Sequence, residues 1–263
     1  MSGSLERRQF LKLASLLTGG AAALADAPLR QALAAERAAS GGGATDGETA
    51  LHWLEGAPAS FSGATWGVPW PQGRVPRNAA FELRGASGGV KAVQSWPLAY
   101  WPDGTLKWSA HALPPDAGGG KPEAGYTLQP SAGADAANAG AHGPLLAKDD
   151  SAGIEIDTGV LQCALPRGGA VLVTAMKRSG KPLLRDGRLV LLVDDGIDDE
   201  SAGTARRSYD GAVDKVTLEQ NGPLRAVVRV DGSHRHADGA RLLPFVVRLY
   251  FYKNSDTVRL VHT

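Results

Sequence analysis

Glycine and proline interrupt this chain throughout, with 34 glycines and 16 prolines among its 263 residues. Their combined share is well above the roughly 12% of average usage. Both residues break helices and favour turns, so few windows remain in which a long helix can form. Hydrophobic residues make up 43% of the chain, which is enough for a sizeable core. The sequence therefore predicts an all-β protein in which short strands are joined by turns.

Charge and cysteine content exclude several classes of protein. The chain has 28 basic and 27 acidic residues and a net charge of +1. This balance gives no indication of nucleic-acid binding. The single cysteine, Cys163, excludes an internal disulfide framework and a cysteine-based zinc cluster. Because Cys163 lies in the apolar run 161–165, we expect a buried small side chain rather than a nucleophile.

The N-terminus resembles a twin-arginine export signal. Arg7 and Arg8 are followed by Phe10 and Leu11, and a mildly hydrophobic run extends from Leu13 to Ala25. That run is shorter than the ~20 residues of a membrane-spanning helix, so no stable membrane anchor is predicted. An ordinary amphipathic helix is the alternative interpretation.

We expect a helical signal peptide at residues 1–35 and a spacer at 36–47. The small-residue sites Ala23-Leu24-Ala25 and Ala32-Leu33-Ala34 are both suitable for cleavage. Export through the twin-arginine translocase, the expected partner, would deliver the folded chain to the periplasm or the extracellular space.

A β-hairpin is the clearest local pattern in the body of the chain. Pro102-Asp103-Gly104 has the composition of a tight turn. Apolar residues alternate on both sides of this turn, as expected for two paired strands. We expect Trp96 and Trp108 to lie on the apolar side, in the core, and Ser109 and His111 to face the other way.

Two β regions are predicted, at 48–130 and 151–263, with a linker at 131–150. The linker is rich in Ala, Gly, Asp and Asn, which cannot build a core. In the second region, apolar residues alternate with Arg-bearing positions over 225–230 and 245–251. Long strands with one apolar face indicate an antiparallel sheet that packs on a second sheet.

Four segments resemble the exo-rhamnogalacturonan lyase-like family. Two lie in the first β region: Thr65–Pro76 reads TWGVPWPQGRVP, and Val93–Leu113 reads VQSWPLAYWPDGTLKWSAHAL. Two lie in the second: Pro223–His234 reads PLRAVVRVDGSH, and Pro244–Thr263 reads PFVVRLYFYKNSDTVRLVHT.

The resemblance implies a small N-terminal β-barrel of the swapped-hairpin type, a central β-sandwich and an α/α toroid. It also implies β-elimination on a pectic backbone of alternating rhamnose and galacturonate. Residues 48–130 correspond to the barrel and 151–263 to part of the sandwich, which we expect to be incomplete. No catalytic residue can be carried over, so the catalytic residues stay unknown.

Three tryptophans are candidate carbohydrate-binding residues. Trp66, Trp70 and Trp101 lie beside glycine or proline, where loops expose side chains. Indole faces stack on sugar rings, but in a small barrel tryptophan also serves as core packing. Both interpretations stay open from sequence alone.

A second candidate site lies on the polar face of the second β region. Arg229, Arg248 and Arg259 lie on this face together with Tyr250 and Arg225. Arginine binds carboxylates in a bidentate manner, and galacturonate supplies one carboxylate per repeat. A solvated sheet face is the alternative.

No metal or other cofactor is predicted. His234 and His236 have a metal-like spacing but lack obvious further ligands. The acidic segment Asp194–Glu200 does not have EF-hand spacing, so we interpret it as a solvated loop. A calcium site in this segment is the alternative interpretation.

Two functions remain as hypotheses. In the first, this is the non-catalytic N-terminal portion of an exported polysaccharide lyase-like protein that acts on rhamnogalacturonan. In the second, it is a stand-alone exported β-protein that binds glycans or scaffolds a partner. The expected ligand is a polysaccharide or oligosaccharide, and under both hypotheses the chain is inactive on its own.

Export depends on the paired arginines. We expect the replacement of Arg7 and Arg8 by lysine to trap the protein in the cytoplasm, because the twin-arginine pathway recognises this pair. Fractionation and immunoblotting measure the periplasmic yield. An unchanged yield would refute the export assignment.

Overall fold

The computed structural model describes residues 47–131, 143–194 and 206–263. These residues form strands, turns and irregular segments, and no helix occurs among them. The all-β prediction is thus confirmed for the described part of the chain. Nor does this part contain a helix of the length and hydropathy needed to cross a membrane. The predicted signal peptide, with Arg7, Arg8, Phe10 and Leu11, lies outside the described residues.

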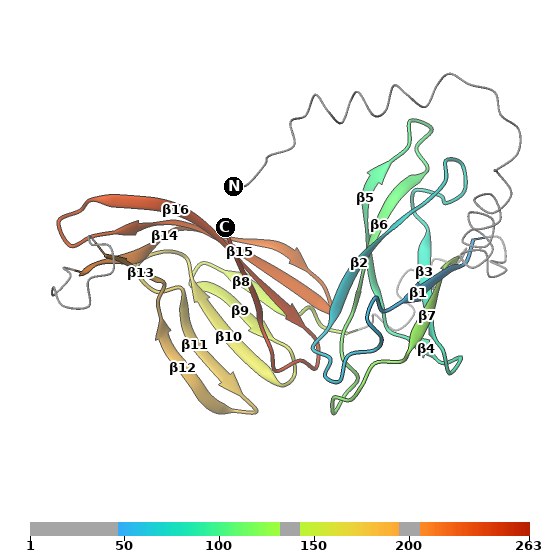
Figure 1. The fold of residues 1–263 in the computed structure, drawn as a ribbon, viewed down its shortest axis with the longest axis horizontal. Coiled ribbons are helices and arrows are strands. Elements are labelled where there is room, and N and C mark those ends of the chain that lie inside the picture. The colour runs from blue at the N-terminus through green and yellow to red at the C-terminus, as the bar shows by residue number, and fades with distance from the viewer. Residues whose placement is uncertain (1–46, 132–142, 195–205) are drawn as a thin grey trace, which may run out of the picture. The chain divides into compact units, whose positions relative to one another are not determined.

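The first β region is a barrel-like domain of two antiparallel sheets, β1-β7-β3-β4 and β2-β6-β5 (Figure 1). Its strands, in chain order, are β1 (Thr49–His52), β2 (Ala64–Pro69), β3 (Ala80–Gly85), β4 (Val90–Lys91), β5 (Gln94–Tyr100), β6 (Leu106–Leu113) and β7 (Gly125–Ser131).

The predicted hairpin is formed by β5 and β6. The amide of Trp101 donates to the carbonyl of Thr105 at 2.8 Å, and Gly104 adopts the positive φ of 83° that the turn requires. The predicted facing of the side chains is wrong beyond the turn, because Trp108 is 41% exposed whereas Ser109 and His111 are fully buried. The pairing of β5 with β6 shifts twice near Ala99, and each shift changes which face a side chain occupies.

The interior of the barrel combines apolar packing with a short polar network. Phe81, Leu83 and Leu128 are among its buried apolar residues. His111 is the polar centre: its Nε2 lies 2.6 Å from the Ser109 hydroxyl and its Nδ1 lies 2.8 Å from the Ser95 hydroxyl. Both ring nitrogens are therefore satisfied without solvent.

The second β region is a sandwich of two five-stranded antiparallel sheets, β12-β11-β10-β9-β8 and β13-β14-β15-β16-β17 (Figure 1). The strands of the first sheet are β8 (Ala147–Asp150), β9 (Gly153–Asp157), β10 (Leu161–Pro166), β11 (Val173–Arg178) and β12 (Lys181–Gly187). Those of the second are β13 (Val190–Asp194), β14 (Arg206–Asn221), β15 (Arg225–Arg235), β16 (Arg241–Tyr252) and β17 (Arg259–His262).

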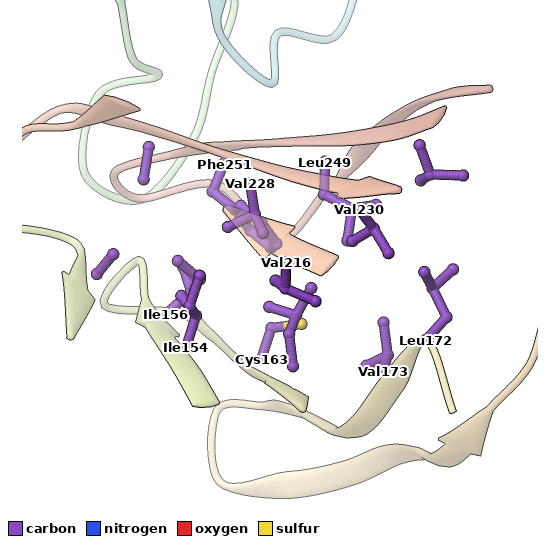
Figure 2. Close-up of a cluster of buried hydrophobic side chains, with 14 of the residues drawn as sticks. Ile154, Ile156, Cys163, Leu172, Val173, Val216, Val228, Val230, Leu249 and Phe251 are labelled. Carbon is purple, nitrogen blue, oxygen red and sulfur yellow. The ribbon is translucent and has the colours of Figure 1, made fainter. Parts of the chain in front are cut away.

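The sandwich core forms where the inward faces of the two sheets meet. Val228 and Val230 from β15 and Leu249 and Phe251 from β16 face the apolar residues of the opposite sheet (Figure 2). The predicted alternation in these strands is confirmed. Cys163 from β10 is buried in the same core, and this burial raises the pKa of its thiol to about 12, as expected for a packing residue.

The last residues of the predicted linker, 131–150, belong to the sandwich. β8 already pairs with β9, with Ala147 opposite Ile156, and Leu146 and Ala147 are buried in the core. The residues between β7 and Gly143 lie outside the described part of the chain.

One side chain of the barrel is bonded to the backbone of the sandwich. Gln94 Oε1 accepts from the amide of Leu224 at 3.0 Å and from that of Arg225 at 2.9 Å, and Gln94 Nε2 donates to the Arg225 carbonyl at 3.3 Å. A Cβ on Gly222 would lie 2.2 Å from Gln94 Oε1, so a larger residue at 222 would displace the Gln94 amide from these bonds. The two β regions belong to one contact unit, residues 46–263.

We expect Gln94→Leu to lower the free energy of unfolding by about 2–4 kcal/mol, because two backbone N–H groups lose their acceptor at roughly 1–3 kcal/mol each. Urea titration of the mature chain measures this change. Gln162→Leu is the matched control, since Gln162 is exposed and its side chain bonds to Asp157 alone among the described residues. Equal stability of the two variants would contradict the assigned role of Gln94.

A pH dependence follows from His111, whose pKa is lowered from 6.5 to about 4 by burial. Between these values the unfolded chain binds a proton that the folded chain does not, so stability falls as the pH falls through this window. The expected loss from pH 7 to pH 4 is about 3 kcal/mol.

His111→Gln should remove this contribution, because glutamine retains a polar group but does not titrate. The measurement is the free energy of unfolding at pH 7 and pH 4 for the wild type, His111→Gln and the exposed-site control His52→Gln. The interpretation fails if all three proteins lose the same stability on acidification.

Candidate carbohydrate-binding site

The seven predicted binding residues fall on two surfaces. Trp66, Trp70 and Trp101 belong to the barrel, and Arg229, Arg248, Tyr250 and Arg259 belong to the sheet β13–β17. The four sandwich residues lie on three adjacent strands: Arg229 in β15 is paired with Arg248 in β16, and Tyr250 in β16 is paired with Arg259 in β17.

Two of the three tryptophans have structural contacts. Trp70 is buried, stacks on Phe81 at a centroid distance of 5.5 Å and donates to the Ser109 hydroxyl at 2.7 Å. The indole N–H of Trp101 donates to the Trp70 carbonyl at 2.9 Å, and the Lys107 ammonium lies 4.5 Å from its ring centroid. Trp70 is therefore not an exposed sugar platform, because its ring completes the barrel core.

Trp66 is half-buried, like Trp101, but unlike the other two it lines a cavity of about 680 Å³ on the barrel. Its ring stacks on His111 with centroids 5.7 Å apart and planes inclined by 30°. The part of the indole that His111 does not cover remains for a ligand.

Arg229 and Arg248 are neutralised by acidic neighbours. Arg248 binds Glu219 through two hydrogen bonds of 2.7 and 2.9 Å, and the bond to Arg248 lowers the pKa of Glu219. Arg229 binds Asp231 with a shortest distance of 2.6 Å. An anionic ligand would have to displace these carboxylates, so the pairs fit the alternative of a solvated, charge-balanced sheet face.

Tyr250 lies between two guanidinium groups. The guanidinium carbon of Arg225 is 5.2 Å from the Tyr250 ring centroid, and that of Arg259 is 5.5 Å from it. Neither arginine forms an ion pair with an acidic residue in the described part of the chain. Arg259 is exposed, whereas Arg225 is only 7% exposed. This cluster, Arg225–Tyr250–Arg259, is the most electropositive aromatic site formed by the predicted residues.

Arg225 has an unusual environment for a buried cation. Its Nη1 bonds to the Gln220 amide oxygen, its guanidinium lies 5.0 Å from the Trp96 ring centroid, and its buried Nε has no hydrogen-bond partner. Aromatic faces offset part of the cost of burying a cation. An anion that binds beside Tyr250 would offset more of it.

Sequence reasoning missed Trp96 as a member of this site. The alternation in β15 places Arg225 on the same face as Arg229, so Arg225 could be predicted. Trp96 comes from the barrel strand β5, and no local pattern shows that a residue of one domain contacts a residue of the other.

No metal centre is evident in this region. Groups of three or more His, Cys, Asp or Glu side chains that could bind a metal are absent from the described residues. His234 is buried, and its Nδ1 lies 3.0 Å from the Leu243 carbonyl. Of the acidic segment predicted as a calcium alternative, all but Asp194 lies outside the described residues, and Asp194 pairs with Arg206 at 3.0 Å.

Comparison with known proteins identifies two domains. Residues 47–131 match the PcRGLX-like N-terminal RIFT barrel domain, and residues 145–263 match the PcRGLX-like protein central beta sandwich domain. The uncharacterized protein YetA of Bacillus subtilis (strain 168) is 33% identical over 223 residues, which cover 81% of this chain and 24% of YetA. The chain thus spans about a quarter of the length of this relative.

Two solved structures from Enterococcus faecalis are also similar. An alpha-mannosidase from strain V583 has a TM-score of 0.46 and 11% identity over 88% of this chain and 32% of its own. A protein in the glycosyl hydrolase family 38 has a TM-score of 0.44 and 10% identity over 82% of this chain and 31% of its own. At these TM-scores the likeness carries no argument about function.

Proposed function

Because the chain belongs to the PcRGLX-like family, which is related to the rhamnogalacturonan lyases, we propose that it is the polysaccharide-binding N-terminal portion of an exported lyase-like protein. The ligand is a pectic polymer that contains galacturonate. In this proposal the barrel and the sandwich bind and orient the polymer, and β-elimination takes place in the longer protein.

The observation that carries the proposal is the Arg225–Tyr250–Arg259 cluster. A uronate ring presents a carboxylate on one edge and C–H bonds on its faces. Arg259 is exposed and without a carboxylate partner in the described part of the chain, so its guanidinium can bind the uronate carboxylate. The Tyr250 ring then provides an apolar surface for the sugar.

The ion pairs on this sheet determine which arginine can bind the carboxylate of the ligand. Arg229 and Arg248 already bind Asp231 and Glu219, so only Arg259 can bind a new carboxylate at little cost. Arg225, buried behind the tyrosine contact, adds fixed positive charge. Oligosaccharide affinity should therefore depend on the ligand's carboxylate and decrease with added salt.

This chain alone is proposed to be inactive as a lyase. Elimination requires a base near C5 of the uronate, stabilisation of the developing enolate and a proton source for the leaving oxygen. The cluster provides cations and an aromatic ring, which serve binding and orientation.

We expect Arg259→Ala to weaken the binding of oligogalacturonate to the mature chain about tenfold, because a charge-assisted hydrogen bond contributes roughly 1.5 kcal/mol or more. Isothermal titration calorimetry measures the dissociation constant. Arg241→Ala is the matched control, since Arg241 is an exposed arginine at the start of β16, away from the segment of β16 that pairs with β17, and its removal changes the net charge equally. If both substitutions weaken binding equally, the loss of affinity reflects long-range electrostatic attraction alone, and the proposed site at Arg259 is refuted.

A further inference from the structure

The barrel cavity that Trp66 lines differs in chemical character from the Arg225–Tyr250–Arg259 cluster. It is about 680 Å³ in volume and lies between β1, the segment that follows it, and β2. Its lining includes the aromatic residues Trp53, Trp66 and Tyr126 and the apolar residues Leu51 and Leu113. This volume is in the range of pockets that hold a small ligand.

The aromatic side chains of this cavity are fixed by contacts with neighbouring residues of the barrel. Trp53 donates its indole N–H to the Glu123 carbonyl at 2.8 Å and meets Tyr126 edge to face, with centroids 6.4 Å apart. Trp66 is stacked on His111, which is itself held by two serine hydroxyls. The aromatic walls are therefore preorganised, which lowers the cost of binding a rigid ring.

The charged residues of the cavity distinguish it from the Arg225–Tyr250–Arg259 cluster. No lysine or arginine is among the described residues that line it, and its ionisable groups are Glu55, His52 and the Tyr126 phenol. Glu55 and His52 are exposed, and neither side chain has a partner in the described part of the chain. A carboxylate accepts hydrogen bonds from hydroxyl groups but repels another carboxylate.

We propose that this cavity binds a neutral pyranose ring. The C–H faces of the sugar pack against Trp66 and Trp53, and its hydroxyl groups donate to Glu55 and hydrogen-bond with His52. Glu55 excludes uronates, so the barrel and the sandwich select different sugars. This inference goes beyond the proposed function and depends on a different domain, a different set of residues and the opposite charge preference.

A neutral sugar fits this lining better than a cationic ligand. Trp53 and Tyr126 meet edge to face and Trp66 stacks on His111, so each ring packs against a protein neighbour on one side and the three rings do not form a cage around a cation. The lining contains one carboxylate, Glu55, and one imidazole, His52, and no second acid. Hydroxyl groups match this mixed donor and acceptor pair, whereas an ammonium group would have only one anionic partner.

The test uses two ligands that differ in charge alone. Oligogalacturonate, and the same oligosaccharide with its carboxylates reduced to primary alcohols, are titrated into the ¹⁵N-labelled mature chain. The neutral oligosaccharide is expected to shift the indole N–H resonances of Trp66 and Trp53. The acidic one is expected to leave them unchanged. Absence of any neutral-ligand shift at Trp66 and Trp53 overturns the proposal.

Variants separate this site from the sandwich site. Glu55→Ala should weaken neutral-ligand binding at least fivefold, and Glu55→Gln should let the acidic ligand shift the Trp66 resonance. Trp66→Ala should reduce neutral binding at least tenfold, and because it could also unfold the barrel, it counts only if its circular dichroism spectrum is unchanged. Arg241→Ala should leave neutral binding unchanged, and it serves as the control because Arg241 is exposed and belongs to neither proposed site.

Neutral binding that is equally strong in wild type and Glu55→Ala refutes the inference. The inference is also refuted if Arg259→Ala weakens the binding of the neutral ligand and the Glu55 variants do not. Failure of the uronate proposal would instead appear as acidic-ligand binding that Arg259→Ala does not change, so the two failures are distinguishable.

Discussion

The Gln94 side chain makes the contact on which the proposed uronate site depends. Its amide bonds three times to Leu224 and Arg225, at the start of β15. Trp96 lies two residues further along β5, on the same side of that strand, and its ring lies beside the Arg225 guanidinium. The bonds that fix the Arg225 backbone therefore also bring an aromatic ring from the barrel to a cation of the sandwich. Neither domain alone contains this arrangement.

Charge distribution separates the two proposed binding surfaces. In the sandwich, Glu219 and Asp231 neutralise Arg248 and Arg229, and this leaves Arg259 beside Tyr250 without an acidic partner in the described part of the chain. In the barrel cavity the fixed charge is Glu55. In the proposal, a polymer that alternates acidic and neutral sugars offers a ligand to each surface, and two weak contacts carried by one chain raise overall affinity more than either alone.

Much of the fold could be predicted from the sequence because period-two alternation is a local property. It correctly identified the inward faces of β15 and β16 and the burial of Cys163. It failed in β6, where shifts in pairing near Ala99 turn Trp108 outward and His111 inward. The candidate site was predicted in part: Tyr250 and Arg259 lie together, but neighbouring acids occupy Arg229 and Arg248. Trp70 lies in the core because its indole N–H has a buried acceptor, and no sequence pattern reveals that partner.

The polar network inside the barrel connects core packing with the cavity. An apolar residue at His111 would also fill the space, but it would not have two ring nitrogens fixed by Ser95 and Ser109. Those bonds set the plane of the imidazole, and Trp66 stacks on that plane at an inclination of 30°. Burial keeps His111 neutral at physiological pH, so the network orients the Trp66 indole without placing a charge behind it. A neutral, hydrogen-bonded core residue can thus determine the orientation of an aromatic ring at the cavity wall, which a freely rotating aliphatic neighbour would not do.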